Sequence, residues 1–318
     1  MNCWPERTRF LKKIYYSAKF LALCLALLLV GGCAPQKAPS AEYTDDLGTP
    51  FSLSPQSRVV CCYGSFAECW SLAGGSLVGA TQDALDERGL DLNGAQIVGT
   101  VKEINLERVV ALQPDLVILS ADLAAHLSLK ESLAALKIPT ACFRVDTFED
   151  YRRLMKLFCT VLNNPAAFKE HVTQVGARID EILQKIPRDH GQTALLMRAY
   201  STGIKAKGQD HLAGQILQDF GVLNITDQHP SLLEELSPEE VIRQDPQVIL
   251  VSAMGNEASA HAYLKEHLET NPAWQKLQAV ETGRYVLLPK ELFHYKPNHR
   301  WDESYEFIAK ILFPEVFA

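Results

Sequence analysis

One short segment of the chain combines the side chains that a large ligand requires. Residues 290–296 read KELFHYK, so Phe293, His294 and Tyr295 stand together in a stretch bounded by two lysines. Aromatic faces hold planar or chelate ligands, and cations pair with the carboxylates or phosphates of such ligands. This segment is our best candidate for a binding loop. Alternatively, Phe293 and Tyr295 pack beneath the final helix and His294 is a hydrogen-bonded surface group.

Further candidates directly follow predicted strands, because open parallel sheets bind ligands at the carboxyl ends of their strands. Arg198 continues the apolar strand 194–197, where an unpaired buried charge would be costly, so it suits an anionic ligand. The predicted ligand-binding residues outside the loop are Tyr63, Lys102, Arg144, Arg198, Tyr200 and Met254.

Metal and catalytic motifs are absent from the sequence. A bare divalent ion needs three or four convergent His, Asp or Glu ligands, and the nine histidines are scattered. His261 and His267 are near each other, but at a spacing that does not share a helix face well. No phosphate loop, nucleophile elbow or H-E-x-x-H pair is present, so we predict no catalytic or metal site. A carrier of free divalent metal and a lipoprotein enzyme or sensor on the same fold remain the alternatives.

The elements that position these residues are indicated by an internal repeat. Residues 106–120, LERVVALQPDLVILS, recur 132 positions later as PEEVIRQDPQVILVS at residues 238–252. Each copy is typical of a short helix, a proline-containing turn and a buried strand of a parallel sheet. The chain is therefore predicted to contain two similar lobes.

The remaining pattern alternates strands with helices, which indicates an α/β fold with two Rossmann-like lobes and parallel-type sheets. Apolar residues from Phe168 to Ile186 recur at helical spacing between Pro165 and Pro187, which predicts one long connecting helix. We expect an N-terminal lobe at 57–163, the connecting helix at 164–188 and a C-terminal lobe at 189–318, with the ligand cleft between the lobes.

The repeat also pairs two glutamates, Glu107 and Glu239, each in the first turn of its helix. Stabilisation of the helix dipole alone could explain them. However, a helix that precedes a parallel strand begins at the ligand-binding edge of the sheet, so one glutamate is expected on the rim of each lobe. The competitors for a role on this rim are Glu68, Glu234, Glu235 and Glu240, and Glu68 is expected on an exposed helix face.

The N-terminus has the pattern of a secretory signal. Basic residues precede an apolar run at 20–30, which is too short for a transmembrane helix and ends in V-G-G-C at Cys33. Residues 33–56 are predicted to be a flexible spacer. Without residues 1–32 the chain has 26 basic and 37 acidic residues, a net charge of −11, which argues against nucleic acid or an anionic lipid surface as partner. The cysteines form no spaced disulfide framework.

Residues 103–118, EINLERVVALQPDLVI, resemble the hallmark segment of the ABC-transporter solute-binding proteins for vitamin B12, ferric siderophores and haem. Supporting matches occur at 58–68, 206–226 and the second repeat copy, and V-G-G-C resembles the lipobox of bacterial lipoproteins. The resemblance covers about residues 57–312. It implies two lobes joined by a helix, with the ligand held between them.

The resemblance also implies partners and a location. Cys33 would be lipidated and hold the protein, as a monomer, outside the cytoplasmic membrane. Glu107 and Glu239 would dock onto arginines of an ABC permease dimer driven by ATPase subunits. No enzyme activity and no cofactor are expected; the bound ligand would be an iron chelate, haem or a corrinoid. Because Val101 stands where similar vitamin B12 binders carry tryptophan, a ferric siderophore or other iron chelate is favoured.

Overall fold

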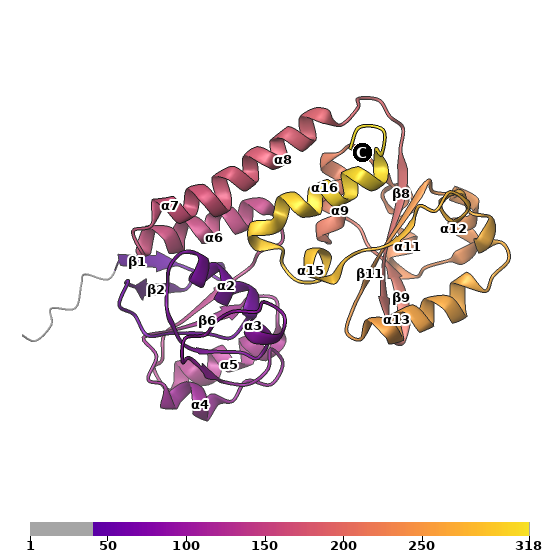
Figure 1. Ribbon diagram of the computed structural model, residues 1–318. Coiled ribbons are helices and arrows are strands. Elements are labelled where there is room, and N and C mark those ends of the chain that lie inside the picture. The colour runs from indigo at the N-terminus through magenta and orange to yellow at the C-terminus, as the bar shows by residue number, and fades with distance from the viewer. Residues whose placement is uncertain (1–40, 318) are drawn as a thin grey trace, which may run out of the picture. The chain divides into compact units, whose positions relative to one another are not determined.

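The computed structural model describes residues 41–317, and its first lobe is built on a five-stranded parallel sheet (Figure 1). Its order is β5-β4-β3-β6-β7. The runs VVC and LVILS form β3 and β6, and every residue in them is buried, as expected for strands covered on both faces. The bounds are β3 Val59–Cys61, β4 Leu77–Ala80, β5 Gln96–Ile97, β6 Leu116–Ser120 and β7 Thr140–Phe143.

Helices cover both faces of this sheet. Alternate residues of each strand point to opposite faces and pack into two separate hydrophobic cores. Val59 and Ile118 join a core with Trp70 and Phe158, whose rings meet edge to face at 5.2 Å, whereas Val60 joins a second core on the opposite face. The helices are α2 Gly64–Leu72, α3 Asp83–Asp86, α4 Leu106–Ala111, α5 Ala124–Ala135 and α6 Phe148–Val161.

The predicted flexible spacer is wrong from residue 41 onward. Strands β1 (Ala41–Thr44) and β2 (Pro50–Leu53) form an antiparallel hairpin whose Phe51 and Leu53 are buried. The carboxylate of Asp45 accepts hydrogen bonds from the amides of Thr49 at 2.7 Å and Cys142 at 2.8 Å, which ties the hairpin to β7. A four-residue strand with only two apolar residues gives too short a sequence pattern to be distinguished from a linker. Cys33 and the signal segment lie outside the described residues.

The connecting helix runs from Pro165 to Lys185, as the apolar stripe predicts. It comprises α7 (Pro165–Phe168), a π-helical turn at Lys169–Thr173 and α8 (Gln174–Lys185). Asn164 caps its first turn by accepting from the Ala167 amide at 3.2 Å. Helix α8 packs against the final helix α16 (Trp301–Leu312), and the two run side by side in Figure 1.

The second lobe has a sheet of the predicted parallel type, to which one antiparallel strand is added. Its parallel order is β10-β8-β11-β12, and β9 pairs antiparallel with β8. Strand β8 continues three residues past Met197 to Tyr200 and turns back into β9, whose sequence GIKA has no strand-like alternation. The bounds are β8 Thr193–Tyr200, β9 Gly203–Ala206, β10 Leu223–Asn224, β11 Val248–Ala253 and β12 Tyr285–Leu287.

Short helical segments connect the strands of the second lobe. They are α9 Leu212–Asp219, α10 Ile225–Gln228, α11 Ser231–Glu234, α12 Pro238–Gln244, α13 Glu257–Leu264 continued by a π turn at Lys265–Glu269, a 3₁₀ turn at Trp274–Lys276, α14 Gln278–Glu281, α15 Lys290–Phe293 and a 3₁₀ turn at Asn298–Arg300. The predicted α/β fold with two lobes is confirmed.

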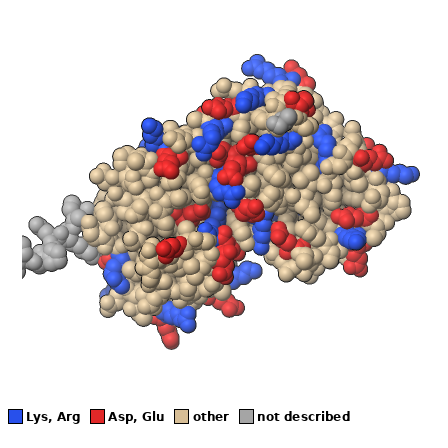
Figure 2. All heavy atoms as spheres, in the orientation of Figure 1, with Lys and Arg blue, Asp and Glu red and all other residues tan. Residues whose placement is uncertain are grey.

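Two further observations bear on the chain's surroundings. Across residues 41–317, no helix has both the length and the apolar content to span a membrane. All five cysteines of this range are buried and free, and all five belong to the first lobe. Figure 2 shows basic and acidic side chains interspersed on the displayed face, so charge of neither sign is segregated there.

Candidate functional site

In each sheet the order in which the chain adds strands reverses between two neighbouring strands. The candidate site lies at the carboxyl ends of these two strand pairs. In the first lobe the chain leaves β3 toward β4 on one side and passes from β6 to β7 on the other. In the second lobe β8 and β11 form the corresponding pair. Ligands of open α/β sheets bind outside the carboxyl ends of such strands. Tyr63 follows β3, Asp122 follows β6, Arg198 lies near the end of β8 and Met254 follows β11.

A cavity of about 460 Å³ opens at these strand ends and is lined by both lobes. Its volume falls within the range of pockets that hold drug-sized ligands. Seven of the nine predicted ligand-binding residues line it, namely Tyr63, Lys102, Arg198, Met254, Phe293, His294 and Tyr295. The structure therefore brings together residues up to 232 positions apart in the sequence, from Tyr63 to Tyr295.

The other two predicted residues lie outside the lining. The guanidinium of Arg144 forms a salt bridge with Asp122. Asp122 lines the cavity, whereas Arg144 does not. Tyr200 is the last residue of β8 and pairs with Gly203 across the tight β8–β9 turn. The predicted strand end at Met197 placed Tyr200 in a loop, whereas the longer strand carries it past the cavity.

Several lining residues were not predicted from the sequence. Asp122 and Asp146 follow β6 and β7, so the rule that selected Arg144 could also have found them. Glu87 and His211 come from a helix end and a loop, where no strand pattern marks them. The lining residues absent from the prediction are Glu87, Val101, Ser120, Asp122, Leu123, Asp146, Gln209, Asp210, His211 and Leu212, whereas Lys296 belongs to the predicted binding loop.

Arg198 is a cation on the second-lobe wall of the cavity. Its Nε lies 3.5 Å from Ser252 Oγ, and within residues 41–317 no carboxylate forms a salt bridge with it. It is partly buried, so its charge is incompletely hydrated. An anionic group entering the cavity would meet a guanidinium that no carboxylate of residues 41–317 already neutralises.

Two neutral histidines accompany Arg198. Burial, followed by the nearby charges of Arg198 and Lys207, lowers the pKa of His211 to about 3. Burial, followed by Lys290 and Arg198, lowers the pKa of His294 to about 4. Both imidazoles are therefore uncharged near pH 7 and add no positive charge beside Arg198.

The tautomer of His211 follows from its hydrogen bond. Its Nδ1 accepts from the Ala213 amide at 3.1 Å and caps α9, so the proton is on Nε2. That Nε2 is buried and has no hydrogen-bond partner among the described residues, and the whole side chain is 3% exposed. His211 thus caps the start of α9 through Nδ1, and its Nε2–H remains an unpaired hydrogen-bond donor, among the described residues, in a side chain that lines the cavity.

On the first-lobe wall, buried His126 fixes the loop that carries Lys102. The amide of Ser120 donates to His126 Nδ1 at 2.9 Å, so Nε2 carries the proton and donates to Val101 O at 2.9 Å. This bridge joins the end of β6 to the backbone beside Lys102. The cation is thereby presented at a defined point of the cavity rim.

The aromatic candidates behave differently from one another. Phe293 is 3% exposed and its ring lies 5.7 Å from Phe307 on α16, so it packs beneath the final helix and also borders the cavity. Tyr295 is partly exposed, with Lys290 Nζ 5.2 Å from its ring centroid. Lys296 Nζ bonds Asp146 Oδ1 at 2.9 Å and joins the binding loop to the first lobe.

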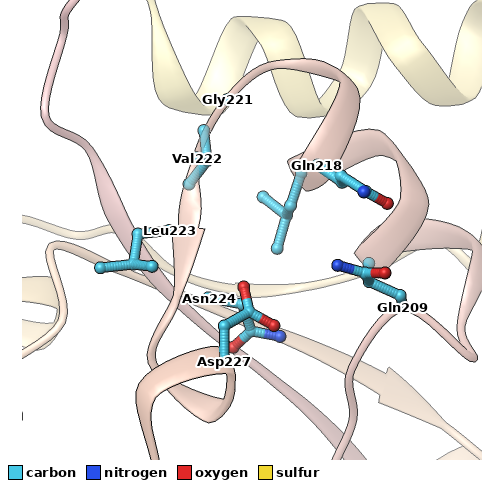
Figure 3. A pocket seen from close by; sticks show the side chains of 9 residues that line it. Gln209, Gln218, Gly221, Val222, Leu223, Asn224 and Asp227 are labelled. Carbon is cyan, nitrogen blue, oxygen red and sulfur yellow. The ribbon is translucent and has the colours of Figure 1, made fainter.

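A second, smaller cavity lies wholly in the second lobe and has a volume of about 230 Å³ (Figure 3). The amides of Gln209 and Gln218 and the carboxylate of Asp227 converge on it, and Leu223 borders it. No lysine or arginine lines it. It lacks both the aromatic faces and the cations that the larger cavity provides, so the larger cavity is the candidate site.

The paired glutamates occupy equivalent exposed positions on the two lobes. Glu107 is in the first turn of α4, capped by Asn105, and Glu239 is in the first turn of α12, capped by Ser237. Among the described residues neither forms a salt bridge, although Glu239 Oε2 accepts from Ser237 Oγ at 3.2 Å. Glu240, by contrast, is engaged by Arg243 and Gln244.

Glu68 was expected on an exposed helix face, and that expectation is wrong. Helix α2 is buried along almost its whole length, and Glu68 is 8% exposed. It forms an ion pair with Arg88 and accepts from Asn298. Its charge is satisfied inside the protein, so it is no candidate for an external docking point.

Within residues 41–317, no cluster of three or more His, Cys, Asp or Glu side chains could hold a metal ion. The alternative of a carrier for bare divalent metal therefore finds no ligand set in this range. The cavity combines cations, aromatic faces and neutral donors with four carboxylates, of which Asp122, Asp146 and Asp210 are already paired with Arg144, Lys296 and Lys207.

Comparisons with known proteins agree with this architecture. A family model described as periplasmic binding protein matches residues 59–292. The chain is 26% identical over 289 residues to the Fe(3+)-citrate-binding protein YfmC of Bacillus subtilis, covering 85% of this chain and 89% of YfmC. It is 23% identical over 287 residues to the putative ABC transporter substrate-binding lipoprotein YhfQ of the same organism, covering 83% and 87%.

Solved structures support the same fold. The iron uptake ABC transporter substrate-binding protein PiuA of Streptococcus pneumoniae superposes with a TM-score of 0.66 at 19% identity, covering 87% of this chain and 99% of PiuA. The family model spans most of the chain, and the relatives are solute-binding proteins rather than enzymes. The chain belongs to the periplasmic binding protein family, as an extracytoplasmic substrate-binding protein of an ABC importer.

Proposed function

We propose that this protein captures a carboxylate-bearing ferric chelate and delivers it to its permease. The observation that carries the proposal is Arg198, a partly buried guanidinium that faces the cavity without a carboxylate partner among the described residues. Lys102 adds a second cation from the opposite lobe. Planar, bidentate donation by arginine matches the geometry of a ligand carboxylate.

The size and lining of the cavity support a chelate over the larger ligands of the family. A cavity volume of about 460 Å³ lies in the lower half of the range for drug-sized ligands, which favours a compact chelate over a corrinoid. The rings of Tyr63 and Tyr295 provide apolar faces for the chelate's organic frame. The similarity to the ferric citrate binder YfmC favours the same chemistry.

The decisive test compares ligands and one side chain. Ferric citrate, haemin and cyanocobalamin are titrated into the purified mature protein, with tryptophan fluorescence and calorimetry as readouts. Arg198→Met keeps the length of the side chain but removes its charge, and should weaken ferric citrate binding by roughly 10- to 100-fold through the loss of a charge-assisted pair. Arg152→Met, at an exposed surface pair with Glu149, is the matched control.

Two outcomes contradict the proposal. Binding of haemin or cyanocobalamin without binding of ferric citrate would assign a different ligand. Unchanged ferric citrate affinity in Arg198→Met would show that the guanidinium does not meet the ligand.

We further propose that Cys33 is the lipidated residue that anchors the protein outside the cytoplasmic membrane, and that the protein works there as a monomer. The V-G-G-C sequence and the similarity to the lipoprotein YhfQ support the anchor. Labelling of growing cells with a radioactive fatty acid tests it. Label should appear in the wild-type chain and be lost in Cys33→Ala; equal labelling of both would contradict the assignment.

Glu107 and Glu239 are proposed as the points where the two lobes meet the two permease subunits. Both glutamates are exposed, and each lies in the first turn of the helix that precedes β6 or β11, whose carboxyl ends border the cavity. Neither carboxylate is neutralised by a basic side chain of the described range. An arginine on each permease subunit would complete these two pairs.

A further inference from the structure

The segment that follows the last strand of the second lobe is fastened to the first lobe. We call residues 294–300 the return segment. Its Lys296 bonds Asp146 at 2.9 Å, and its Asn298 Nδ2 donates to Ser65 O at 2.8 Å and to Glu68 Oε2 at 2.6 Å. Asn298 is 1% exposed and adopts φ 53°, a left-handed conformation that asparagine tolerates better than most residues. The wall of the cavity formed by the binding loop is therefore held from the opposite lobe.

A buried ion pair lies at the centre of this attachment. Arg88 Nη1 is 3.2 Å from Glu68 Oε2, and the two side chains are only 8% and 11% exposed. His299 Nδ1 of the return segment is 3.4 Å from the other carboxylate oxygen. Burial by itself raises the pKa of the Glu68 carboxyl, but His299, Arg88 and Asn298 outweigh burial and hold that pKa below its ordinary value. Glu68 is thus a charged, fully engaged group.

Arg88 connects this buried pair to the cavity. Its other terminal nitrogen hydrogen-bonds Ser65 Oγ, and its guanidinium carbon lies 5.5 Å from the centroid of the Tyr295 ring. Lys290 Nζ lies 5.2 Å from the same centroid. Tyr295 lines the cavity, whereas Arg88 and Glu68 do not. A guanidinium held by a buried carboxylate therefore lies within cation–π distance of an aromatic ring at the cavity wall.

We infer that Arg88 is a positioning residue for ligand binding: held by Glu68 and Ser65, it fixes the ring of Tyr295, and thereby the second-lobe wall of the cavity, from the first lobe. The inference rests on the proposed function for its ligand. A purely structural role would also explain a buried pair, since removing one partner leaves a buried charge unpaired. The two roles differ in whether the effect of Arg88 on affinity passes through Tyr295.

A double-mutant cycle separates them, with ferric citrate as the probe. Arg88→Leu should weaken binding by about 5- to 30-fold, the range expected when a desolvated cation–π contact is lost. In a Tyr295→Leu background, the same change should have less than about a two-fold effect, because the ring that Arg88 positions is gone. An equal loss in both backgrounds would overturn the inference.

The matched control is Arg58→Leu in the same lobe. Arg58 donates to Leu112 O at 2.7 Å and to Gln113 O at 3.2 Å, far from the cavity lining, so its loss disturbs the lobe without touching Tyr295. Its effect on affinity should be small and identical in both backgrounds. If Arg88→Leu does not fold, Arg88→Lys replaces it in the cycle, since lysine keeps the charge but cannot bond Glu68 and Ser65 with one planar fork.

Amide hydrogen exchange of the ligand-free protein tests the role of Arg88 independently of ligand binding. The amides of residues 293–296 and of Asn298 should exchange at least about ten-fold faster in the Arg88 variant and remain unchanged in Arg58→Leu. Unaltered exchange would overturn the inference whatever the ligand. If the wild type binds no ferric citrate, the proposed function fails, and the exchange result alone then decides whether Arg88 positions the loop.

Discussion

Protonation of His211 should make the protein lose stability on acidification, by an amount that the structure allows us to calculate. The side chain is 3% exposed, and burial together with Arg198 and Lys207 lowers the pKa of its imidazole to about 3. In the unfolded chain the pKa of histidine is about 6.5. Between these values the unfolded chain binds a proton that the folded protein excludes, so stability is complete above pH 6.5 and falls as the pH falls.

The magnitude follows from linkage. Integrating the difference in bound protons from pH 7 to pH 5 gives a loss of about 2 kcal/mol from this one residue. Asp210 and His294 also face the imidazole, and Asp210 opposes the shift, but burial dominates. His126, His171 and His294 have lowered pKa values as well, so the whole protein should lose more than His211 alone accounts for.

The variant His211→Asn isolates the contribution, because asparagine can still cap α9 by accepting from the Ala213 amide. Urea unfolding followed by circular dichroism at pH 7 and pH 5 gives the free energy of unfolding for each protein. The loss between the two pH values should be about 2 kcal/mol smaller in His211→Asn than in the wild type. His267→Asn, at an exposed position, is the control. Equal losses in the wild type and His211→Asn would refute the reasoning.

Three further predictions concern other parts of the chain. Reversing the charge of both Glu107 and Glu239 to arginine should abolish uptake of ferric citrate by cells and leave the affinity in solution unchanged, since neither side chain lines the cavity. Asp45→Ala should lower the free energy of unfolding by about 3 kcal/mol in urea, because the backbone amides that it accepts from lose a charged acceptor. Gly214→Ala should cost about 2 kcal/mol or more, because a Cβ there would stand 2.0 Å from the carbonyl oxygen of Gly208.

Each of these has a matched control. Glu234→Arg changes an exposed charge of the second lobe and should permit normal uptake; uptake by the double variant at the wild-type rate would contradict the docking proposal. Asp91→Ala removes an exposed turn acceptor and should change stability by less than about 0.5 kcal/mol. Gly203→Ala meets no atom within 4 Å and should be similarly mild; equal costs at both glycines would contradict the packing argument.

Regular, long patterns made most of the fold predictable from the sequence. The repeat identified β6 and β11, because a fully buried parallel strand is a continuous apolar run. The stripe from Phe168 to Ile186 identified the connecting helix. Strands β1, β2 and β9 were not predicted because they are short. Each has four residues, and its strand conformation depends on tertiary contacts such as those of Asp45.

The candidate site was predictable where residues follow a strand and unpredictable where tertiary contacts place them. Tyr63, Lys102 and Met254 were found because a strand end points into the cavity. Tyr200 was misplaced because three extra residues of β8 could not be foreseen. Arg88 and Glu68 carried no signal, since an ion pair between a loop and a buried helix appears in no local pattern.

The distribution of thiols has a practical consequence. All five cysteines of the described range are buried in the first lobe, burial raises the pKa of each, and the sequence contains no cysteine after Cys159. A single cysteine introduced in place of exposed Glu234, five residues before Glu239, would therefore be the one accessible thiol among residues 41–317. A maleimide dye would label it selectively, so the second lobe can carry an optical reporter of permease contact without removing any native side chain from the core.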